Sequence, residues 1–404
     1  MIEGYKQSEI GVIPEDWEVR FLTAFGDVVS GGTPSTSVSE YWDGDIAWCT
    51  PSDITKTRGT TISKTERCIT AKGLFNSAAV LLPPGCVLLC SRATIGDSKI
   101  NSVAMATNQG FKNIVPKNCN ITFLFYLLQT KKQQMLEKAI GSTFLEISKS
   151  ALCSIPMQYP PIPEQQRIAE ALSDMDELIS SLEKLVEKKK AIKQGVMQEL
   201  LTGKRRLPGF SGEWEKTTVG RVTTTSSGGT PSREIKAYYE GNIPWITTSE
   251  LQDCRIYDSK EHITSEAVKS SSAKIFPKGT VLMAMYGATI GKLGVLEIES
   301  TTNQACCALI CNPSITTSFL YHYLCNLREY ILTLGCGAGQ PNISQGIVQN
   351  LPIVIPTPNE QEEICRILDA MDYEVIYLEK RLSKAKEVKQ GLMQQLLTGR
   401  TRFK

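Results

Sequence analysis

The sequence is poor in the residues that catalysis and membrane insertion need. It has only two His, His262 and His322, no Cys-x-x-Cys pair, and no apolar run of the roughly 18 residues that a membrane span requires. A duplicated histidine site, a zinc site built on paired cysteines and a membrane partner are therefore not expected. The 13 Cys lie mostly in apolar, strand-like runs, which indicates reduced, buried thiols in a cytoplasmic protein that is not exported.

Motifs for nucleotide and phosphate chemistry are also missing. No G-x-G-x-x-G opens a helix after a strand, and GATIGK at 287–292 has one residue too few between its glycines for a phosphate loop. Its counterpart RATIGD at 92–97 lacks the Lys, so both segments are interpreted as Gly-hinged turns between strands. The sequence predicts no catalytic residues, no cofactor and no metal. With 44 Lys and Arg against 42 Asp and Glu, the net charge neither requires nor excludes a polyanionic partner.

What the sequence does contain is an internal repeat. SGGTPS occurs at 30–35 and at 227–232, and EQQRIAEALSDMD (164–176) matches EQEEICRILDAMD (360–372), with an offset of 196 or 197 residues. Each repeat holds a globular portion followed by a long polar segment. The predicted domains are a globular domain over 1–160, a central helix over 161–203, a second globular domain over 204–356 and a C-terminal helix over 357–404.

The globular portions have the pattern of an α+β fold. Short apolar runs alternate with Gly, Pro, Asn and Ser clusters, and helical periodicity is found at 122–140 and at 317–334. The apolar runs predicted as strands are Val80–Leu82, Cys86–Cys90, Val281–Met285 and Ala305–Cys311.

The long segments carry a narrow apolar stripe at steps of three and four residues, which is typical of a coiled-coil seam. Each predicted helix ends at a Thr-Gly, where Gly203 and Gly399 suit a helix C-terminus. The predicted seam consists of Ile168, Leu172, Met175, Ile179, Leu182 and Val186 in the first helix and Ile364, Leu368, Met371, Val375, Leu378 and Leu382 in the second.

The charges on these helices predict which way they run. Six acids against one Arg lie between 164 and 183, five Lys follow at 184–193, and the second helix repeats this polarity. Antiparallel packing places each acidic half beside the other helix's basic half, whereas parallel packing opposes like charges. The alternative is that Lys188–Lys190 is a solvated face. Two similar globular domains, a two-helix spacer and an internal pseudo-twofold repeat describe a device that presents two binding surfaces, which suits two half-sites on double-stranded DNA.

At these residues the sequence resembles the specificity (S, HsdS) subunit of type I restriction-modification systems. The matching pieces are SGGTPS, YWDGDIAWCTPSDI, ATIG, TNQG, GSTFLEIS, IPMQYPPIPEQQRIAEAL and KQGVMQELLTGK, each with a counterpart in the other repeat. The resemblance implies two target-recognition domains that each read one half of a bipartite DNA sequence. It also implies spacer helices that dock two methyltransferase (M) subunits, with restriction (R) subunits joining the complex. Methylation and ATP-driven cleavage belong to those partners, so this chain is expected to be non-catalytic and without cofactors.

DNA-facing residues are nominated by type and by position on turns. Arg and Lys suit phosphates and guanine, Asn and Gln suit adenine, and paired Gly allow a close backbone approach. The candidates are Thr33, Ser35, Arg58, Arg92, Thr94 and Lys112 in the first domain and Thr230, Ser232, Arg233, Tyr286, Gln340 and Asn342 in the second. For SGGTPS the alternative is a fold-determining turn shared by both domains. The strongest divergence, GSTFLEIS (141–148) against GAGQPNIS (337–344), predicts that the two domains read different half-sequences.

Two other functions compete with this one. The first is a structural adaptor with two protein-binding modules on a coiled-coil rod and no nucleic acid. The second is a fused subunit with its own nuclease or methylase activity. The second is disfavoured because no Asp/Asn-Pro-Pro-aromatic motif occurs, Asn312-Pro313-Ser314 being the nearest match.

Overall fold

A computed structural model describes residues 3–141, 145–335 and 342–403. The chain divides into two compact units, unit 1 with residues 1–184 and 380–404 and unit 2 with residues 185–379. Each unit contains one globular portion, the beginning of one long helix and the end of the other. The two long helices are α6 (Ile162–Leu200) and α12 (Pro358–Leu396), each of 39 residues.

Unit 1 is built on a five-stranded sheet of order β4-β11-β8-β9-β6, a three-stranded sheet of order β10-β5-β7 and two strand pairs, β1-β2 and β12-β3. The strands are β1 (Tyr5–Ser8), β2 (Gly11–Pro14), β3 (Glu18–Phe21), β4 (Gly26–Ser30), β5 (Trp42–Cys49), β6 (Thr61–Ile62), β7 (Arg67–Ile69), β8 (Val87–Leu89), β9 (Ser98–Asn101), β10 (Met105–Thr107), β11 (Lys112–Pro116) and β12 (Pro156–Tyr159). Its short helices are α1 (Pro51–Lys56), α2 (Ala71–Phe75), α3 (Ile121–Thr130), α4 (Lys132–Glu137) and α5 (Lys149–Cys153).

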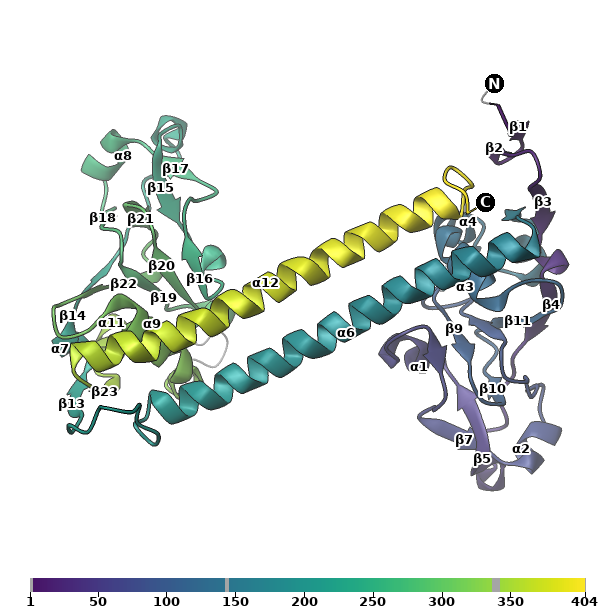
Figure 1. The fold of residues 1–404 in the computed structure, drawn as a ribbon, viewed down its shortest axis with the longest axis horizontal. Coiled ribbons are helices and arrows are strands. Elements are labelled where there is room, and N and C mark those ends of the chain that lie inside the picture. The colour runs from purple at the N-terminus through teal and green to yellow at the C-terminus, as the bar shows by residue number, and fades with distance from the viewer. Residues whose placement is uncertain (1–2, 142–144, 336–341, 404) are drawn as a thin grey trace. The chain divides into compact units, whose positions relative to one another are not determined.

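Side-chain alternation places a core on each face of the five-stranded sheet. Val87 and Leu89 of β8 belong to one cluster with Leu172 of α6 and Leu396 of α12. Helix α3 and the ends of the long helices lie together in this part of unit 1 (Figure 1). Leu88, between Val87 and Leu89, points to the opposite face and packs in the cluster that the smaller sheet covers. The α3 layer therefore connects the globular portion to the helices.

Unit 2 repeats this plan. Its five-stranded sheet has the order β14-β22-β19-β20-β16, beside a four-stranded sheet β17-β15-β21-β18 and the pair β13-β23. The strands are β13 (Glu215–Thr218), β14 (Thr223–Ser227), β15 (Ile243–Ile246), β16 (Cys254–Ile256), β17 (His262–Ile263), β18 (Ile275–Phe276), β19 (Val281–Ala284), β20 (Leu293–Leu296), β21 (Ser300–Thr302), β22 (Cys306–Cys311) and β23 (Pro352–Ile355). Its short helices are α7 (Val219–Val222), α8 (Ser265–Lys269), α9 (Thr317–Asn326), α10 (Arg328–Thr333) and α11 (Gln345–Gln349).

The α+β prediction is confirmed, with two local corrections. Val80–Leu82 is not a strand, because only Leu82 pairs, through an isolated bridge to Met105. Each predicted helix around residues 122–140 and 317–334 is two helices, α3 and α4 or α9 and α10, separated by a single residue, Lys131 or Leu327.

The long helices run antiparallel within each unit, as the charge pattern predicts. In unit 1, Asp176 and Glu183 of α6 pair with Lys389 and Lys386 of α12 at 2.6 and 2.7 Å. The residue numbers of the paired side chains therefore rise along α6 while they fall along α12, as in an antiparallel pair.

Unit 2 has the mirrored pattern, with basic residues on α6. Lys189 and Lys190 lie 2.7 and 2.6 Å from Glu374 and Glu379 of α12, so two members of the Lys188–Lys190 run form interhelical ion pairs. Of the predicted seam, Met175, Met371 and Leu382 are half-buried and the other nine residues are buried, namely Ile168, Leu172, Ile179, Leu182, Val186, Ile364, Leu368, Val375 and Leu378.

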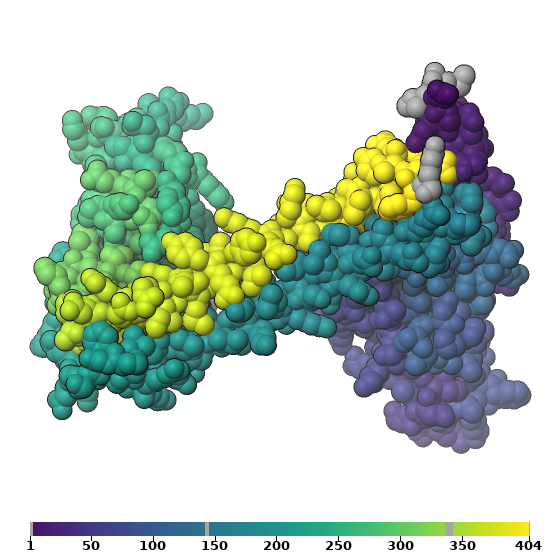
Figure 2. All heavy atoms as spheres, in the orientation of Figure 1, coloured from purple at the N-terminus to yellow at the C-terminus, as the bar shows by residue number. Residues whose placement is uncertain are grey.

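A buried carboxylate at the start of each long helix attaches it to the globular portion. In unit 1, Glu164 is 5% exposed and accepts hydrogen bonds from the Trp17 indole at 2.8 Å and from Arg402 at 3.0 and 2.7 Å. Arg402 also donates to Asp16 at 2.6 and 2.7 Å. Figure 2 shows the C-terminal segment (yellow) next to the N-terminal segment (purple). In unit 2, Glu360 takes the same role with Trp214 and Arg206.

The described cysteines are free thiols, and several are buried among apolar side chains. Burial raises the pKa of Cys86 to about 11, so this thiol is protonated at neutral pH. None of the helices in the described part of the chain combines the length and apolar character that a bilayer-spanning helix needs.

The Arg402 contact predicts a large effect of substituting a single half-buried residue. Arg402→Ala leaves the buried Glu164 without its cation, which should lower the free energy of unfolding by about 3 kcal/mol. Arg400→Ala, two residues away and exposed, should change it by less than about 0.5 kcal/mol. Urea denaturation of both variants measures the difference.

The same pair of variants has a defined pH dependence. The hydrogen bond from Arg402 holds the pKa of Asp16 below its ordinary value of 3.8. A depressed carboxyl pKa contributes stability above the unfolded value, and this stability is lost as the pH falls through the folded value. Part of the stability lost in Arg402→Ala comes from the contact with Asp16. This part should disappear as the pH falls below 3.8. If the loss of unfolding free energy in Arg402→Ala increased as the pH fell, this assignment would be contradicted.

Candidate nucleic-acid interface

The SGGTPS loops are fixed by the fold. In unit 1 the indole of Trp48 donates to the carbonyl of Gly32 at 2.9 Å, and Trp245 donates to Gly229 in unit 2 at the same distance. A Cβ on Gly32 would lie 2.3 Å from the backbone of Ala78, so only glycine fits there. The paired glycines thus serve the shared turn, which is the alternative interpretation of this motif.

The threonine hydroxyl groups of the loops bond to a neighbouring turn. Thr33 donates to the Gln109 side chain of the TNQG turn, and Thr230 makes the same bond to Gln304. The carbonyl of Gly110, next to Gln109, accepts from the amide of Ser91 at 2.7 Å. This links three turns into one exposed edge, which we call the recognition edge: in unit 1 Thr33, Gln109, Arg92 and Glu146, and in unit 2 Thr230, Gln304, Tyr286 and Asn342.

The two recognition edges differ in chemistry where the last two turns meet. In unit 1, Arg92 forms a bridge with Glu146 and an ion pair at 2.7 Å. This hydrogen bond from Arg92 is the main cause that holds the pKa of Glu146 below its ordinary value. In unit 2 the corresponding bridge joins Tyr286 to Asn342, two exposed, uncharged side chains. The same backbone bridge therefore presents an ion pair in one unit and an amide with a phenol in the other.

The remaining candidates have varied environments. Ser35, Arg58 and Ser232 are exposed, and Thr94 is half-buried. Lys112 is only 8% exposed, and its ammonium lies 3.4 Å from Glu146, so its charge is directed at that carboxylate. Gln340 lies outside the described residues.

Sequence reasoning nominated Arg233 but missed Arg67 and the aromatic pair beside each SGGTPS loop on which an arginine stacks. In unit 1 the rings of Trp42 and Trp48 meet edge to face at 5.0 Å, and the exposed Arg67 guanidinium lies 3.6 Å from the centre of Trp42. Among the residues that the structure describes, no carboxylate pairs with Arg67.

The corresponding pair in unit 2 receives its cation from a different position. Arg233 lies 4.2 Å from the centre of the Tyr239 ring and forms an ion pair with Glu261. The backbone of Glu261 bonds to Trp245, and the backbone of Arg67 pairs with Trp48, the residue equivalent to Trp245. Glu261 therefore occupies the place of Arg67. The aromatic residues were visible in the repeat alignment. Arg67 and Arg233 lie at non-equivalent positions, so the alignment did not indicate Arg67 as the counterpart of the nominated Arg233.

The chain matches the family model described as type I restriction modification DNA specificity domain twice, over residues 14–194 and 211–389. It is 29% identical to the type I restriction enzyme MjaIX specificity subunit of Methanocaldococcus jannaschii, covering 98% of this chain and 96% of the relative. It is 26% identical to the EcoR124I/EcoR124II specificity subunit of Escherichia coli, covering 62% of this chain and 63% of that protein.

Solved structures show the same fold. The S subunit of a type I restriction-modification system from M. genitalium superposes with a TM-score of 0.63 at 16% identity, over 94% of this chain and 96% of that one. A chain from a structural study of complex assembly and conformational transition of the type I system gives 0.61 at 18% identity, over 96% and 99%. With both copies of the repeat matched by its model, the chain belongs to the type I restriction-modification DNA specificity family.

Proposed function

We propose that this chain is the non-catalytic subunit that gives a type I restriction-modification complex its DNA sequence specificity, with each globular portion reading one half of a bipartite, asymmetric double-stranded target. The observation that carries the proposal is the duplicated recognition edge. Its scaffold is the same in both units, whereas its exposed side chains differ, Arg92 with Glu146 in one and Tyr286 with Asn342 in the other. Two copies of one scaffold with different reading groups suit two different half-sites.

Each part of the chain has its own role in this function. Residues 1–160 and 204–356 are the two recognition domains, and 161–203 and 357–404 are the spacer helices. The DNA-contacting set is Thr33, Ser35, Arg58, Arg92, Thr94, Thr230, Ser232, Arg233, Tyr286, Gln340 and Asn342, with Lys112 supporting Glu146 and with Arg67 added.

The spacer helices are proposed to dock two methyltransferase subunits, through which restriction subunits join the complex. The relatives are named as subunits of type I restriction enzymes, so a complex of several chains is expected here as well. Both helices also expose apolar side chains away from the seam, including Leu178 and Ile192 on α6 and Ile376 on α12, each more than 40% exposed. Such side chains are buried when another helix packs against them.

Salt dependence separates DNA recognition from the adaptor alternative. For the full chain with duplex DNA, the observed association constant should fall at least tenfold between about 50 and 200 mM NaCl, because released counterions oppose binding. Fluorescence anisotropy over that range measures the log–log slope. Absence of duplex binding at low salt would favour the adaptor instead.

A substitution in one recognition edge should change the recognition of one half-site only. Arg92→Ala should reduce methylation at sites matching the first half by about ten- to a hundredfold, the range for a lost base contact. Asn342→Ala should act on the second half alone, so each variant is the matched control of the other. Sequencing of methylated bases in cells that carry the variant complex reads both halves at once. A uniform loss across all sequences would assign these residues to phosphate contacts.

If the long helices set the distance between the recognition domains, lengthening both helices should widen the gap between the half-sites. Seven residues inserted at matching points in both α6 and α12 keep the seam in phase and lengthen each helix by about 10 Å, close to three base pairs. The methylated half-sequences should remain as they are while the gap grows by about three base pairs. An unchanged gap would show that the docked subunits, and not helix length, determine the spacing.

A further inference from the structure

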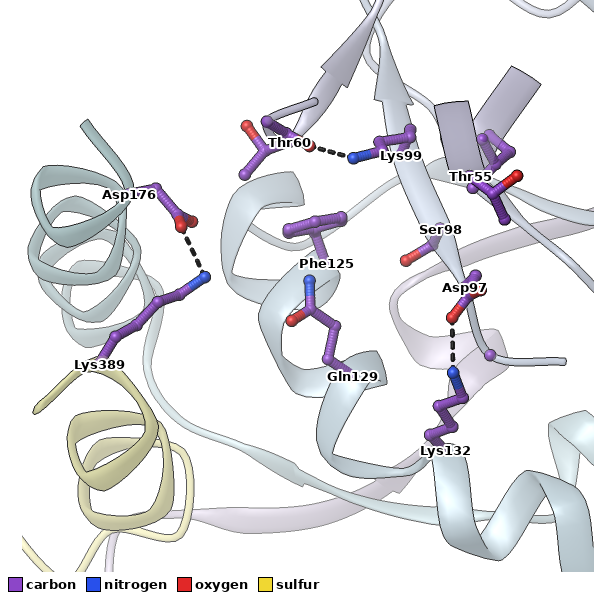
Figure 3. A pocket seen from close by; sticks show the side chains of 13 residues that line it. Thr55, Thr60, Asp97, Ser98, Lys99, Phe125, Gln129, Lys132, Asp176 and Lys389 are labelled. Atoms are coloured by element: carbon purple, nitrogen blue, oxygen red, sulfur yellow. Dashed lines mark hydrogen bonds and ion pairs between the residues drawn. The ribbon is translucent and has the colours of Figure 1, made fainter. Parts of the chain in front are cut away.

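Unit 1 contains a pocket of about 500 Å³ that none of the roles above uses. It lies between the loop that follows α1, the start of β9, the helix α3 and the two long helices (Figure 3). Its polar lining includes three lysines and two aspartates, namely Lys99, Lys132, Lys389, Asp97 and Asp176.

The pocket has an excess of hydrogen-bond donors and of positive charge. Lys132 pairs with Asp97 and Lys389 with Asp176, each at 2.6 Å, whereas Lys99 donates only to the carbonyl of Gly59 and has no carboxylate partner among the described residues. One positive charge is therefore left over.

An unpartnered hydroxyl adds to this excess. Ser98 is 8% exposed, and its Oγ has no hydrogen-bond partner among the described residues. Figure 3 shows this hydroxyl directed toward Gln129, into the pocket. A buried hydroxyl without a partner costs free energy, which a ligand that accepts its hydrogen bond would recover.

The same place in unit 2 is filled by the chain's own carboxylate. Strand pairing aligns Thr61 of β6 with Ile100 and Arg255 of β16 with Val295, so Gly59 and Asp253, each two residues earlier, are equivalent. Both have a positive φ, 76° and 57°.

In unit 2 the Asp253 carboxylate accepts hydrogen bonds from Lys292 and Arg328, both at 2.9 Å, and from the amide of Leu293 at 3.1 Å. These contacts hold the pKa of Asp253 below its ordinary value against the opposing effect of burial. This position of the fold therefore binds an anion where the sequence supplies one.

In unit 1 the position of Asp253 carries no carboxylate. Gly59 has no side chain, and a Cβ built on it meets no atom within 4 Å. By the alignment of β9 with β20 and of α4 with α10, Ser98 takes the place of Leu293 and Lys132 that of Arg328. Lys292 corresponds to Asp97, so the carboxylate of the cluster stands at Asp97 in unit 1 and pairs with Lys132. Lys99 and the Ser98 hydroxyl have no carboxylate partner among the described residues.

We propose that this pocket of unit 1 binds a phosphate group from outside the chain. A phosphate offers several acceptor oxygens to the lysines and to Ser98, and charge-assisted bonds of this kind are strong. The volume exceeds that of one phosphate, and Ile54 and Phe125 provide an apolar wall, so the group is part of a nucleotide or of the DNA backbone. Asp176 and Lys389 belong to the long helices, so an occupant links the recognition domain of unit 1 to them.

The unit 2 arrangement suggests the decisive variant. Gly59→Asp should place a carboxylate in the pocket, as Asp253 does, and should weaken binding of inorganic phosphate and of adenosine monophosphate at least tenfold in calorimetric titration of the full chain. Gly59→Asn, of the same size and equally tolerant of positive φ, is the matched control and should weaken binding less. Circular dichroism checks that both variants fold; if Gly59→Asp does not, Lys132→Met takes its place with the same expected loss.

The reverse variant tests the comparison in unit 2. Asp253→Gly should free Lys292 and Arg328 and raise the phosphate stoichiometry of the chain from one to two.

Duplex DNA separates the two sources of phosphate. If Gly59→Asp weakens duplex binding at least tenfold relative to Gly59→Asn, the occupant is a backbone phosphate. If duplex binding is unchanged while adenosine monophosphate binding is lost, the occupant is a free nucleotide. The proposal is overturned if the wild-type chain binds neither phosphate nor the nucleotide and Gly59→Asp leaves duplex affinity unchanged. Sequence-specific methylation would be intact in that case, so the proposed function would stand independently.

Discussion

Everything in each unit depends on one buried carboxylate at the beginning of a long helix. Glu164 and Glu360 are 5% and 2% exposed, and an unpaired carboxylate in such a place would cost several kcal/mol. Each therefore requires the arginine that follows the end of the other long helix, Arg402 for Glu164 and Arg206 for Glu360. This requirement makes the helices antiparallel in both units and gives each globular portion the start of one helix and the end of the other.

Around that constraint, the repeats keep some residues and change others. The tryptophans that hold the SGGTPS loops and the glycines beneath them are the same, because the loops approach neighbouring backbone too closely for other side chains. Residues at the turn ends can differ, since Arg92, Tyr286 and Asn342 are exposed and lie outside the core. A duplicated scaffold can therefore acquire two binding preferences without losing its core.

The sequence predicted the large features well because they are periodic. The seam, the repeat and the charge polarity each extend over many residues, so a local exception does not hide them. The 122–140 helix was predicted too long because periodicity continues across Lys131, where the backbone leaves helical geometry. At the candidate site, the burial of Lys112 and the stacking of Arg67 follow from packing between distant strands, and the alignment of Gly59 with Asp253 appears only through strand pairing.

The division of the chain also has a consequence for synthesis. Unit 2 is one continuous stretch, 185–379, whereas unit 1 needs residues 380–404 to meet the first 184. During translation the second globular portion has all its residues available before the first has its closing helix. The portion made earliest is thus completed last, and until then the apolar side chains that Leu396 and Leu397 cover are open to solvent and to chaperones.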